Sequence, residues 1–424
     1  MPRAGRRLAG RAEVMRPLAP YSGAAVAAAA ARAPDPAARA AAFGGDERLP
    51  ERQPARHLAL QIGRALHDLM AGDDGALVFG EDVAAKGGVY TVTSGLARAF
   101  PPQRVFNTLL DETTILGLAQ GAGMMGLLPV PEIQYLAYVH NAADQLRGEA
   151  CSQQFFSSDQ FRNPMLVRIA GLAYQKGFGG HFHNDNSIAA LRDIPGLVIA
   201  CPARGDDAAL LLRTCAALCR VDGRVVAFLE PIALYMTRDL HAAGDGEWLF
   251  PYPAPGEAAA FGEPRVYAPE ADDLLVVTYG NGVPMSLRVA RRLEADSGRR
   301  TRVLDLRWLK PLNRAAIAAH AAGIGRALVV DEGRATGGIA EQIVTGLVED
   351  CGREVQLARV AGADSYVPLG NAADTVLVNE AEIEAAARRL LGEHADAGWK
   401  NCVTSPAPTA EVPRRPLSAI LLVT

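Results

Sequence analysis

The fold is decided by one stretch in three parts: His57-Leu-Ala-Leu-Gln-Ile-Gly-Arg-Ala-Leu-His-Asp-Leu-Met70, then Gly72-Asp-Asp-Gly75, then Ala76-Leu-Val-Phe-Gly80. The apolar residues of the first part recur at helical spacing, which would place them on one face of a helix: Leu58, Ile62, Leu66 and Leu69. The glycines and aspartates of the second part predict the end of that helix. The third part is wholly apolar, as is typical of a strand in a parallel sheet that is covered on both faces.

The same alternation continues along the chain. Apolar runs predict further strands at 129–135, 165–169, 197–200 and 225–229. Segments with helical patterning lie between them, at 142–156 and 206–219. Strands that alternate with helices predict an α/β fold with a largely parallel sheet.

A second α/β unit follows the Pro-rich segment Pro251-Tyr-Pro-Ala-Pro-Gly256. Its predicted strands are 273–279, 301–306, 327–331 and 355–359, and its predicted helices are 283–296, 313–322 and 338–348. We therefore expect two domains, at 56–252 and 263–392, joined by a linker at 253–262.

The two ends of the chain have a different composition from the body. Residues 1–43 contain seven Arg but only two acidic residues, and Ala dominates the rest. Residues 1–55 are predicted to be a disordered extension or a targeting segment, because an Arg-rich and acid-poor start is typical of organellar transit peptides. The expected location is the bacterial cytoplasm, or the mitochondrial matrix if residues 1–43 are a transit peptide. The Pro-rich residues 393–424 are predicted to be a disordered tail.

Composition excludes several classes of protein. The chain has 424 residues, 49% hydrophobic residues and a formal net charge of −4, so it lacks the basic excess of a dedicated nucleic-acid binder. Its apolar runs are shorter than the roughly 20 residues that a membrane span needs. Six cysteines spread over this length do not form a disulfide framework, and we expect no metal site among them.

Two glycine motifs lack the neighbouring elements or residues that their usual binding functions require. Gly121-Ala-Gly-Met-Met-Gly126 has the spacing of a dinucleotide-binding loop, but a predicted helix precedes it and a strand follows, so helix packing is the better interpretation. Gly244-Asp-Gly246 begins like a motif that holds Mg²⁺ and a diphosphate. The Asn that must follow is absent between Gly246 and Asn281, so we interpret the segment as a surface turn.

Several motifs occur in order between residues 57 and 392: Gly80-Glu-Asp-Val83, Val105-Phe-Asn-Thr-Leu-Leu-Asp-Glu-Thr-Thr-Ile-Leu-Gly117, Pro131-Glu-Ile-Gln-Tyr135, Gly179-Gly-His-Phe-His-Asn184, Asp305-Leu-Arg-Trp-Leu-Lys-Pro-Leu312 and Val330-Asp-Glu-Gly-Arg-Ala-Thr-Gly-Gly338. With them the chain resembles the β subunit of the thiamine diphosphate-dependent decarboxylase component of 2-oxo acid dehydrogenase complexes, above all the pyruvate and branched-chain members. The resemblance implies a pyrimidine-binding thiamine-enzyme domain followed by a transketolase C-terminal-like domain.

The resemblance also implies the site residues. Glu112 matches the catalytic glutamate that contacts the aminopyrimidine ring, a role that requires a carboxyl kept protonated in an apolar pocket, for which Leu109, Leu110, Ile115 and Leu116 are the expected walls. The alternative for Glu112 is an exposed N-capping acid. Tyr138 matches an aromatic residue that stacks on the pyrimidine, or else is a core tyrosine. Glu81 matches an acid near the cofactor, or else caps a loop.

Two histidines complete the predicted site. His183 matches the family histidine at the entrance of the active site, where an imidazole can exchange protons and assist acyl transfer. His181 lies in the same glycine-rich loop, which contains Gly177, Gly179 and Gly180, and is a second candidate. The sequence departs from the family here, because the usual His-Ser-Gln-Ser is replaced by His183-Asn-Asp-Asn186.

The resemblance implies partners as well. An α subunit would hold Mg²⁺ and the diphosphate and would complete thiamine diphosphate sites in an α₂β₂ heterotetramer. The second domain would help form the dimer and offer a docking surface to the lipoyl acyltransferase core, and backbone carbonyls would be available to a structural K⁺. The poorly patterned first 50 residues also leave open a fragment of a fused αβ polypeptide.

The implied function is the thiamine-dependent oxidative decarboxylation of a 2-oxo acid, with acyl transfer to a lipoyl group. The residues leave the choice of 2-oxo acid open, because pyruvate and branched-chain substrates differ by a few methylene groups. Two alternatives remain: a self-sufficient transketolase or deoxyxylulose-phosphate synthase, and a non-catalytic assembly subunit.

Overall fold

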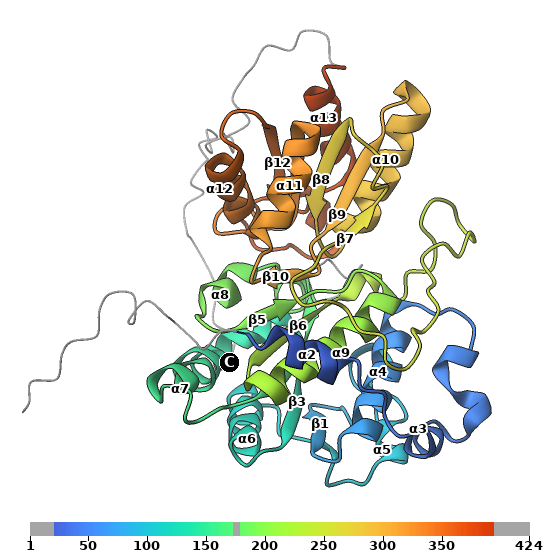
Figure 1. Ribbon diagram of the computed structural model, residues 1–424, viewed down its shortest axis with the longest axis vertical. Helices are drawn as coiled ribbons and strands as arrows, with labels where there is room; N and C mark the ends of the chain where they lie inside the picture. The colour runs from blue at the N-terminus through green and yellow to red at the C-terminus, as the bar shows by residue number, and fades with distance from the viewer. Residues whose placement is uncertain (1–20, 173–178, 394–424) are drawn as a thin grey trace, which may run out of the picture.

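A seven-stranded sheet forms the centre of the N-terminal domain (Figure 1). The computed structural model describes residues 21–172 and 179–393. The strands lie in the order β10-β5-β6-β4-β3-β1-β2 and are parallel, except that β10 is antiparallel to β5. Their bounds are β1 (Ala76–Gly80), β2 (Val105–Asn107), β3 (Leu128–Ile133), β4 (Met165–Gly171), β5 (Val198–Ala200), β6 (Val225–Pro231) and β10 (Trp308–Lys310).

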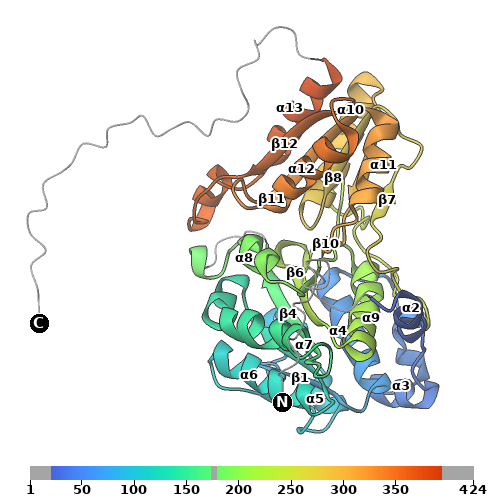
Figure 2. The same ribbon diagram turned by 60° about the vertical axis from the view of Figure 1, so that its left-hand side comes forward.

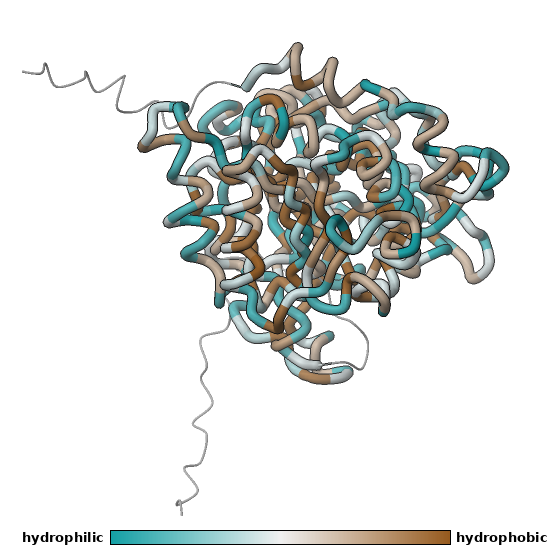
Figure 3. The backbone as a smooth tube through the Cα atoms, turned by 90° about the horizontal axis from the view of Figure 1, so that it is seen from below, coloured by the Kyte–Doolittle hydropathy of each residue, from teal (hydrophilic) through white to brown (hydrophobic). Residues whose placement is uncertain are grey.

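Helices cover both faces of this sheet, as the apolar runs predict. One face packs against α2 (Gly23–Ala30), α4 (Leu58–Gly72) and α9 (Gly205–Asp222). The other packs against α6 (Glu112–Met124), α7 (Cys151–Phe156) and α8 (Ile188–Asp193). Figure 3, seen from below, shows that hydrophobic stretches gather in the centre of the molecule.

The C-terminal domain is built around a five-stranded sheet, which lies above the first sheet in Figures 1 and 2. Its order is β12-β11-β8-β9-β7, and only β7 is antiparallel to its neighbour. The bounds are β7 (Arg265–Tyr267), β8 (Leu274–Thr278), β9 (Thr301–Asp305), β11 (Arg326–Arg334) and β12 (Gln356–Gly362). The sheet lies between α10 (Gly282–Ser297) and α13 (Glu380–Leu391) on one face and α11 (Arg314–Ile324) and α12 (Ile339–Cys351) on the other.

The two-domain α/β architecture with largely parallel sheets is confirmed, and it differs from the expectation in one connection. Strand β10 belongs by sequence to the segment 263–392, but it adds an edge strand to the sheet of the N-terminal domain. One apolar cluster also runs from β5 into β9 and β11. The two domains therefore share part of one core.

The expectation of a disordered extension over residues 1–55 is wrong for residues 21–55. Helices α2 and α3 (Pro36–Phe43) pack against the domain, with Val26 and Ala30 buried against α9. Arg39 is buried, and its guanidinium bonds to Asp68 at 2.7 Å and to Glu51 at 2.8 Å. Small alanines allow this close packing, and the ion pairs compensate the buried charge. Residues 1–20 and 394–424 lie outside the described part of the chain.

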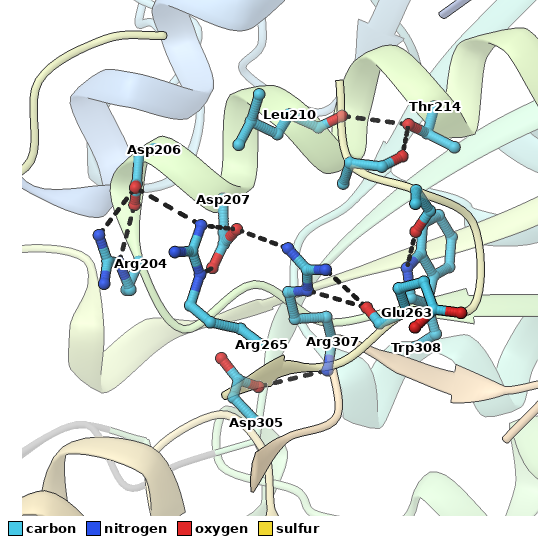
Figure 4. A network of polar contacts seen from close by, with 12 residues as sticks. Arg204, Asp206, Asp207, Leu210, Thr214, Glu263, Arg265, Asp305, Arg307 and Trp308 are labelled. Atoms are coloured by element: carbon cyan, nitrogen blue, oxygen red, sulfur yellow. Dashed lines mark hydrogen bonds and ion pairs between the residues drawn. The ribbon is translucent and has the colours of Figure 1, made fainter. Parts of the chain in front are cut away.

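The predicted linker 253–262 is packed against α9. The Thr214 hydroxyl donates to the carbonyl of Ala259 at 2.6 Å, and the Trp308 indole donates to that of Ala260 at 3.2 Å (Figure 4). This segment is therefore fixed along both domains. In the part of the chain that the structure describes, no helix is both long and apolar enough to cross a membrane.

A cluster of ion pairs joins the two domains beside this linker, and we call it the junction cluster (Figure 4). Asp207, in the first turn of α9, accepts hydrogen bonds from Arg265 at 2.6 and 2.7 Å and from Arg307 at 3.0 Å. Arg307 also donates to the carbonyl of Glu263 at 2.6 Å, and its backbone N–H donates to Asp305 at 3.2 Å. The cluster links the N-terminal domain to the first strands of the second sheet.

Candidate active site

Four of the predicted site residues follow the carboxyl ends of neighbouring strands. Glu81 directly follows β1, and Glu112 begins α6 after β2. Tyr138 lies in the 3₁₀ segment η4 (Leu136–Ala142) after β3, and His183 lies in the loop after β4. Because β4, β3, β1 and β2 are adjacent and parallel, the sheet brings these side chains to one edge, where α/β proteins form their sites.

Glu81 and Glu112 form an interacting pair of acids. Glu81 is 5% exposed, and burial raises the pKa of its carboxyl to about 7, with further contributions from the negative charges of Glu112, Asp82 and Glu132. The Glu81 carboxyl is therefore about half protonated near neutral pH. One of the acids at this edge of the sheet can thus hold a proton where an ordinary glutamate would have lost it.

Glu112 is half-buried, and the apolar pocket expected around it is not built by this chain alone. Ile115 and Leu116 are buried, but Leu109 is 74% exposed and Leu110 is 83% exposed. Both leucines precede α6, and no described residue covers them. The Glu112 carboxylate accepts a hydrogen bond from Asn141 Nδ2 at 3.4 Å. Two of the four expected walls are therefore open.

The residue that caps the N-terminus of α6 is Asp111 and not Glu112. Asp111 is the N-cap residue of α6 and accepts a hydrogen bond from the backbone N–H of Thr114 at 3.3 Å. Glu112 is the first residue of the helix proper. Its carboxyl is thus available at the open edge for another partner.

Tyr138 and His183 meet directly. The Tyr138 hydroxyl lies 3.2 Å from His183 Nε2, and His183 Nδ1 lies 3.3 Å from the carbonyl oxygen of Gly179. Since a carbonyl only accepts, these contacts favour a proton on Nδ1 and a Tyr138 hydroxyl that donates to Nε2. The ring of Tyr135 also packs edge-on against His183, with centroids 4.6 Å apart. The imidazole is therefore held in one orientation.

His181 does not join the other site residues. Its exposed ring packs on Phe182 at 4.1 Å and on Tyr366 of the C-terminal domain at 5.3 Å between centroids. His181 lies inside the short 3₁₀ helix Gly180–Phe182, and His183 is the residue that ends it. The role of His181 therefore stays a prediction, without a contact to the other site residues among those that the structure describes. Gly177, named with this loop, lies outside the described residues.

A buried ion cluster beneath the site was missed by the sequence analysis. Arg168 on β4 bonds to Glu230 on β6 at 2.8 and 3.0 Å and to Glu132 on β3 at 2.6 Å, and all three are almost fully buried. The Tyr235 hydroxyl donates to Glu230 at 2.5 Å. The sequence indicated this cluster only by charged residues, such as Glu132 and Arg168, within predicted strands that are otherwise apolar. Burial raises the pKa of Glu132, against the opposing charge of Arg168.

A second unforeseen cluster fixes the loop after His183. Asp185 accepts a hydrogen bond from Arg334 of the C-terminal domain at 2.9 Å, and its carboxylate lies 3.6 Å from His140 Nε2. The Ser187 hydroxyl bonds to the same carboxylate and lies 3.1 Å from His140. The pKa of Asp185 is lowered to about 2, because these partners outweigh its burial. The departure from His-Ser-Gln-Ser after His183 was the indication in the sequence.

An exposed apolar surface lies on α6 and α7, and we call it the open face. It is made of Leu118, Met124, Met125, Phe155 and Phe156, all exposed in this chain. Gly121, within the glycine motif, has open space around it, whereas a Cβ on Gly123 would lie 2.5 Å from the carbonyl oxygen of Pro164. Gly123 thus allows close packing of α6 against the chain at Pro164, whereas Gly121 lies on the outer side of the helix. Patches of this kind mark protein interfaces.

Gly244–Gly246 forms a turn. The Asp245 carboxylate accepts hydrogen bonds from four backbone N–H groups between residues 240 and 247, at 2.7 to 3.0 Å. The hydrogen bonds of that carboxylate therefore stabilise the turn. Among the described residues, no group of three or more His, Cys, Asp and Glu side chains could hold a metal ion.

Comparison with known proteins places this geometry in a family. The model of the transketolase pyrimidine binding domain matches residues 56–237, and that of the transketolase C-terminal domain matches residues 265–384. The pyruvate dehydrogenase E1 component subunit beta of Bacillus subtilis is 32% identical over 339 residues, which cover 78% of this chain and 97% of that protein. The chain belongs to the β-subunit family of 2-oxo acid dehydrogenase E1 components.

Other members of the family match equally well. The 2-oxoisovalerate dehydrogenase subunit beta of Bacillus subtilis is 32% identical over 336 residues, covering 78% of this chain and 96% of that protein. The Staphylococcus aureus pyruvate dehydrogenase E1 component subunit beta is 33% identical over 339 residues, with 78% and 97% coverage. A solved split-gene transketolase, described as an inactive beta4 tetramer, shares the fold with a TM-score of 0.62 and 20% identity, covering 80% of this chain and 99% of that chain.

The side chains fit one half of a thiamine site. A carboxyl, a flat aromatic ring and an oriented imidazole stand at one edge of the sheet, where Glu112, Tyr138 and His183 are half-buried and accessible. These groups suit a heteroaromatic ring rather than a phosphate, because Glu81 and Glu112 would repel an anion. The fit thus extends to the pyrimidine end of the cofactor.

Proposed function

We propose that this chain is the catalytic β subunit of a thiamine diphosphate-dependent 2-oxo acid decarboxylase. With an α subunit it would oxidatively decarboxylate a 2-oxo acid and pass the acyl group to a lipoyl group. The observation that carries the proposal is the convergence of Glu81, Glu112, Tyr138 and His183 at an edge that this chain leaves open. Family membership adds the reaction type.

The cofactor, when bound, supplies the carbon nucleophile and the electron sink. Glu112 is the group that we place on the ring nitrogen of the pyrimidine, and Tyr138 is the aromatic wall beside it. Glu81, with a pKa raised to about 7, holds a proton next to Glu112. A protonated neighbour reduces the repulsion on Glu112 as the partner subunit closes over it and removes water.

His183 is the group that we assign to proton transfer at the substrate. Its Nε2 accepts from the Tyr138 hydroxyl at 3.2 Å, and Nδ1 contacts the Gly179 carbonyl at 3.3 Å. These contacts fix the orientation of the ring, and a positioned imidazole is what general acid–base catalysis requires; a substrate would take the place of the Tyr138 hydroxyl at Nε2. Asp185, two residues on, ties the loop to the C-terminal domain through Arg334.

The partner is proposed to be an α subunit bound at the open face, in an α₂β₂ heterotetramer. The exposed Leu109 and Leu110 border Glu112, so a chain that covers them would also complete the apolar walls of the site. That chain would hold the diphosphate and Mg²⁺, and a structural K⁺ remains part of the proposal. Docking of the lipoyl acyltransferase core is assigned to the C-terminal domain.

The substrate is proposed as a class. Relatives named for pyruvate and for 2-oxoisovalerate are both 32% identical to this chain, so the comparison favours neither acid. Because the relatives are bacterial proteins, the bacterial cytoplasm is the proposed location. Arg39 packs against Asp68, so this part of the chain belongs to the folded domain.

The test is co-purification with the α subunit, followed by assays with pyruvate and with 3-methyl-2-oxobutanoate in the presence of thiamine diphosphate and Mg²⁺. We expect decarboxylation of at least one acid, and a loss of about 10²-fold or more in the Glu112→Gln variant. Glu47→Gln is the matched control, since the Glu47 side chain is fully exposed.

Three outcomes would contradict the proposal. Full activity of Glu112→Gln would indicate an assembly subunit that does no chemistry. Tight binding of thiamine diphosphate and Mg²⁺ by the isolated chain, with transfer of two-carbon units between sugar phosphates, would indicate a self-sufficient transketolase. Inactivity of the complex towards both acids would remove the assigned reaction.

A further inference from the structure

His140 was not among the predicted site residues, but it contacts the segment that follows His183. Its Nε2 lies 3.1 Å from the Ser187 hydroxyl oxygen and 3.6 Å from Oδ2 of Asp185. The Ser187 hydroxyl bonds to that same oxygen of Asp185. The three side chains therefore form a closed set of contacts beside the candidate active site.

The donors and acceptors of this set can be assigned. The pKa of Asp185 is lowered to about 2, so its carboxylate only accepts, and the Ser187 hydroxyl must donate to it. The oxygen of that hydroxyl can still accept a hydrogen bond, and His140 Nε2 is within reach of it. Nε2 of His140 therefore carries a hydrogen and points it at the loop.

Two contacts follow one another along the same two segments. In η4, Tyr138 and His140 are two residues apart. Their partners in the loop, His183 and Asp185, have the same spacing. Arg334 of the C-terminal domain donates to the other oxygen of Asp185 at 2.9 Å, so the carboxylate is held from both domains. The position of His183 opposite Tyr138 thus depends on the pair that follows it.

We propose that His140 is a positioning residue for His183. It fixes the loop through Asp185 and Ser187, so that the His183 ring stays opposite the Tyr138 hydroxyl. The inference rests on the function proposed above, in which His183 transfers a proton at the substrate.

The chain provides this anchor where it departs from the family motif. The usual His-Ser-Gln-Ser has a neutral Gln at the position of Asp185. A carboxylate accepts a hydrogen bond from an imidazole more strongly than an amide oxygen does, because the carboxylate is charged. The hydrogen bond to Asp185 and the charge of that carboxylate raise the pKa of His140, against desolvation of the ring and the positive charge of Arg334.

Two variants of His140 separate the hydrogen bond from the shape of the ring. The side chain is 53% exposed, so its replacement should leave the fold in place. His140→Phe keeps a flat ring and removes the N–H donor, whereas His140→Gln keeps an N–H donor and removes the ring. His320→Phe is the matched control, since His320 lies on α11 and its Nδ1 contacts Arg302.

The first measurement needs no activity. Nitrogen NMR of the full chain with isotope-labelled histidine reports which ring nitrogen of His183 carries the proton. The form with the proton on Nδ1 should dominate in the unchanged chain, in His140→Gln and in His320→Phe, because the Tyr138 hydroxyl and the Gly179 carbonyl favour it. In His140→Phe these contacts are held less firmly, and the share of this form should fall. An unchanged His183 signal in His140→Phe would overturn the proposal, whether or not the complex is active.

The second measurement uses the complex with the α subunit. His140→Phe should lower kcat about fivefold and change KM by less than about twofold, since it misplaces a proton-transfer group without removing a substrate contact. His140→Gln and His320→Phe should keep kcat within about twofold of the unchanged complex. Equal losses in His140→Phe and His140→Gln would overturn the proposal. Inactivity of the unchanged complex would instead reject the proposed function, and the NMR result would still decide the role of His140.

A double variant tests the route through Asp185. If His140 acts through that carboxylate, His140→Phe combined with Asp185→Asn should lower kcat no further than Asp185→Asn alone, within about twofold. Losses that multiply in the double variant would show that His140 acts by another route, and they would overturn the proposal.

Discussion

The junction cluster and the open face differ in how far their side chains are paired or covered within the chain. At the junction, Asp207, Arg265 and Arg307 satisfy one another at 2.6 to 3.0 Å within the chain (Figure 4). At the open face, Met125 is 81% exposed and no described residue covers it. The groups of the first region are satisfied within a single chain, whereas the second region is apolar and exposed, as is typical of an interface.

This difference separates what the chain must do alone from what it does in a complex. The junction sets the relative position of the two sheets, and with it the distance between the His183 loop and Arg334. The open face is exposed in the described part of the chain, and Glu112 begins the helix that carries much of it. Changes at the junction should therefore alter folding, and changes at the open face should alter assembly without altering folding.

The largest effect is expected at the junction. Asp207→Asn leaves Arg265 and Arg307 without their shared carboxylate, and Asp207 itself is fully buried. Breaking a buried ion pair in this way destabilises proteins by about 3–5 kcal/mol. Chemical unfolding should show a loss of this size for Asp207→Asn. Asp206→Asn is the control, since Asp206 is partly exposed, and equal losses for the two variants would contradict the role of the cluster.

At the open face, assembly should fail while the fold persists. Met125→Lys places a charge in the proposed interface, at the C-terminal end of α6 where a lysine is tolerated. We expect at least about tenfold weaker binding to the α subunit, with unfolding free energy changed by no more than about 0.5 kcal/mol. Val348→Lys, on the exposed side of α12, should leave binding intact. An unchanged complex in Met125→Lys would assign the face to another role.

The sheets could be predicted because buried parallel strands are continuous apolar runs, as at β1, β4 and β6. Strand β10 could not, because it has three residues and pairs with β5 from an earlier part of the chain. Helix α13 was missed although Asn379 and Glu382 form a capping box, which is a recognisable start. Short or late elements thus depend on tertiary context.

The sequence motifs predicted which side chains lie near one another at the site, but not the residues that surround them. The sheet brings Glu112, Tyr138 and His183 together, as the motifs imply, but Leu109 and Leu110 are exposed and do not wall Glu112 within this chain. The orientation of His181 depends on Tyr366 of the other domain, which no local pattern encodes. Local sequence therefore provided the candidate groups, and the surroundings that tune them required the fold.

A moderate effect is expected where the two domains meet beside His183. Asp185→Asn removes the ion pair with Arg334 and the carboxylate that raises the pKa of His140. The pKa of His140 should fall, as measured by NMR titration of histidine-labelled protein, while that of the distant His320 should not change. Activity of the complex should decline by about tenfold or less, because the loop loses one anchor but keeps the Tyr138–His183 contact.

The opposite result would be equally clear. If the pKa of His140 did not move in Asp185→Asn, the cluster would not exist in solution.

Asp185 should also make the chain sensitive to acid. Its folded pKa of about 2 lies below its unfolded value of 3.8, so this contribution to stability is present above about pH 4 and is lost as the pH falls towards 2.

The smallest effect is again at the junction and depends on pH. Asp305 is fully buried, and burial together with the nearby charge of Asp207 raises its pKa to about 7 from 3.8. Between these values the unfolded chain has released this proton and the folded chain keeps it, so stability falls as the pH rises towards 7. Asp305→Asn removes that dependence. Relative to the unchanged chain it should gain on the order of 1 kcal/mol between pH 6 and 8, and a difference that is equal at both pH values would show that the folded-state pKa of Asp305 does not lie in this range.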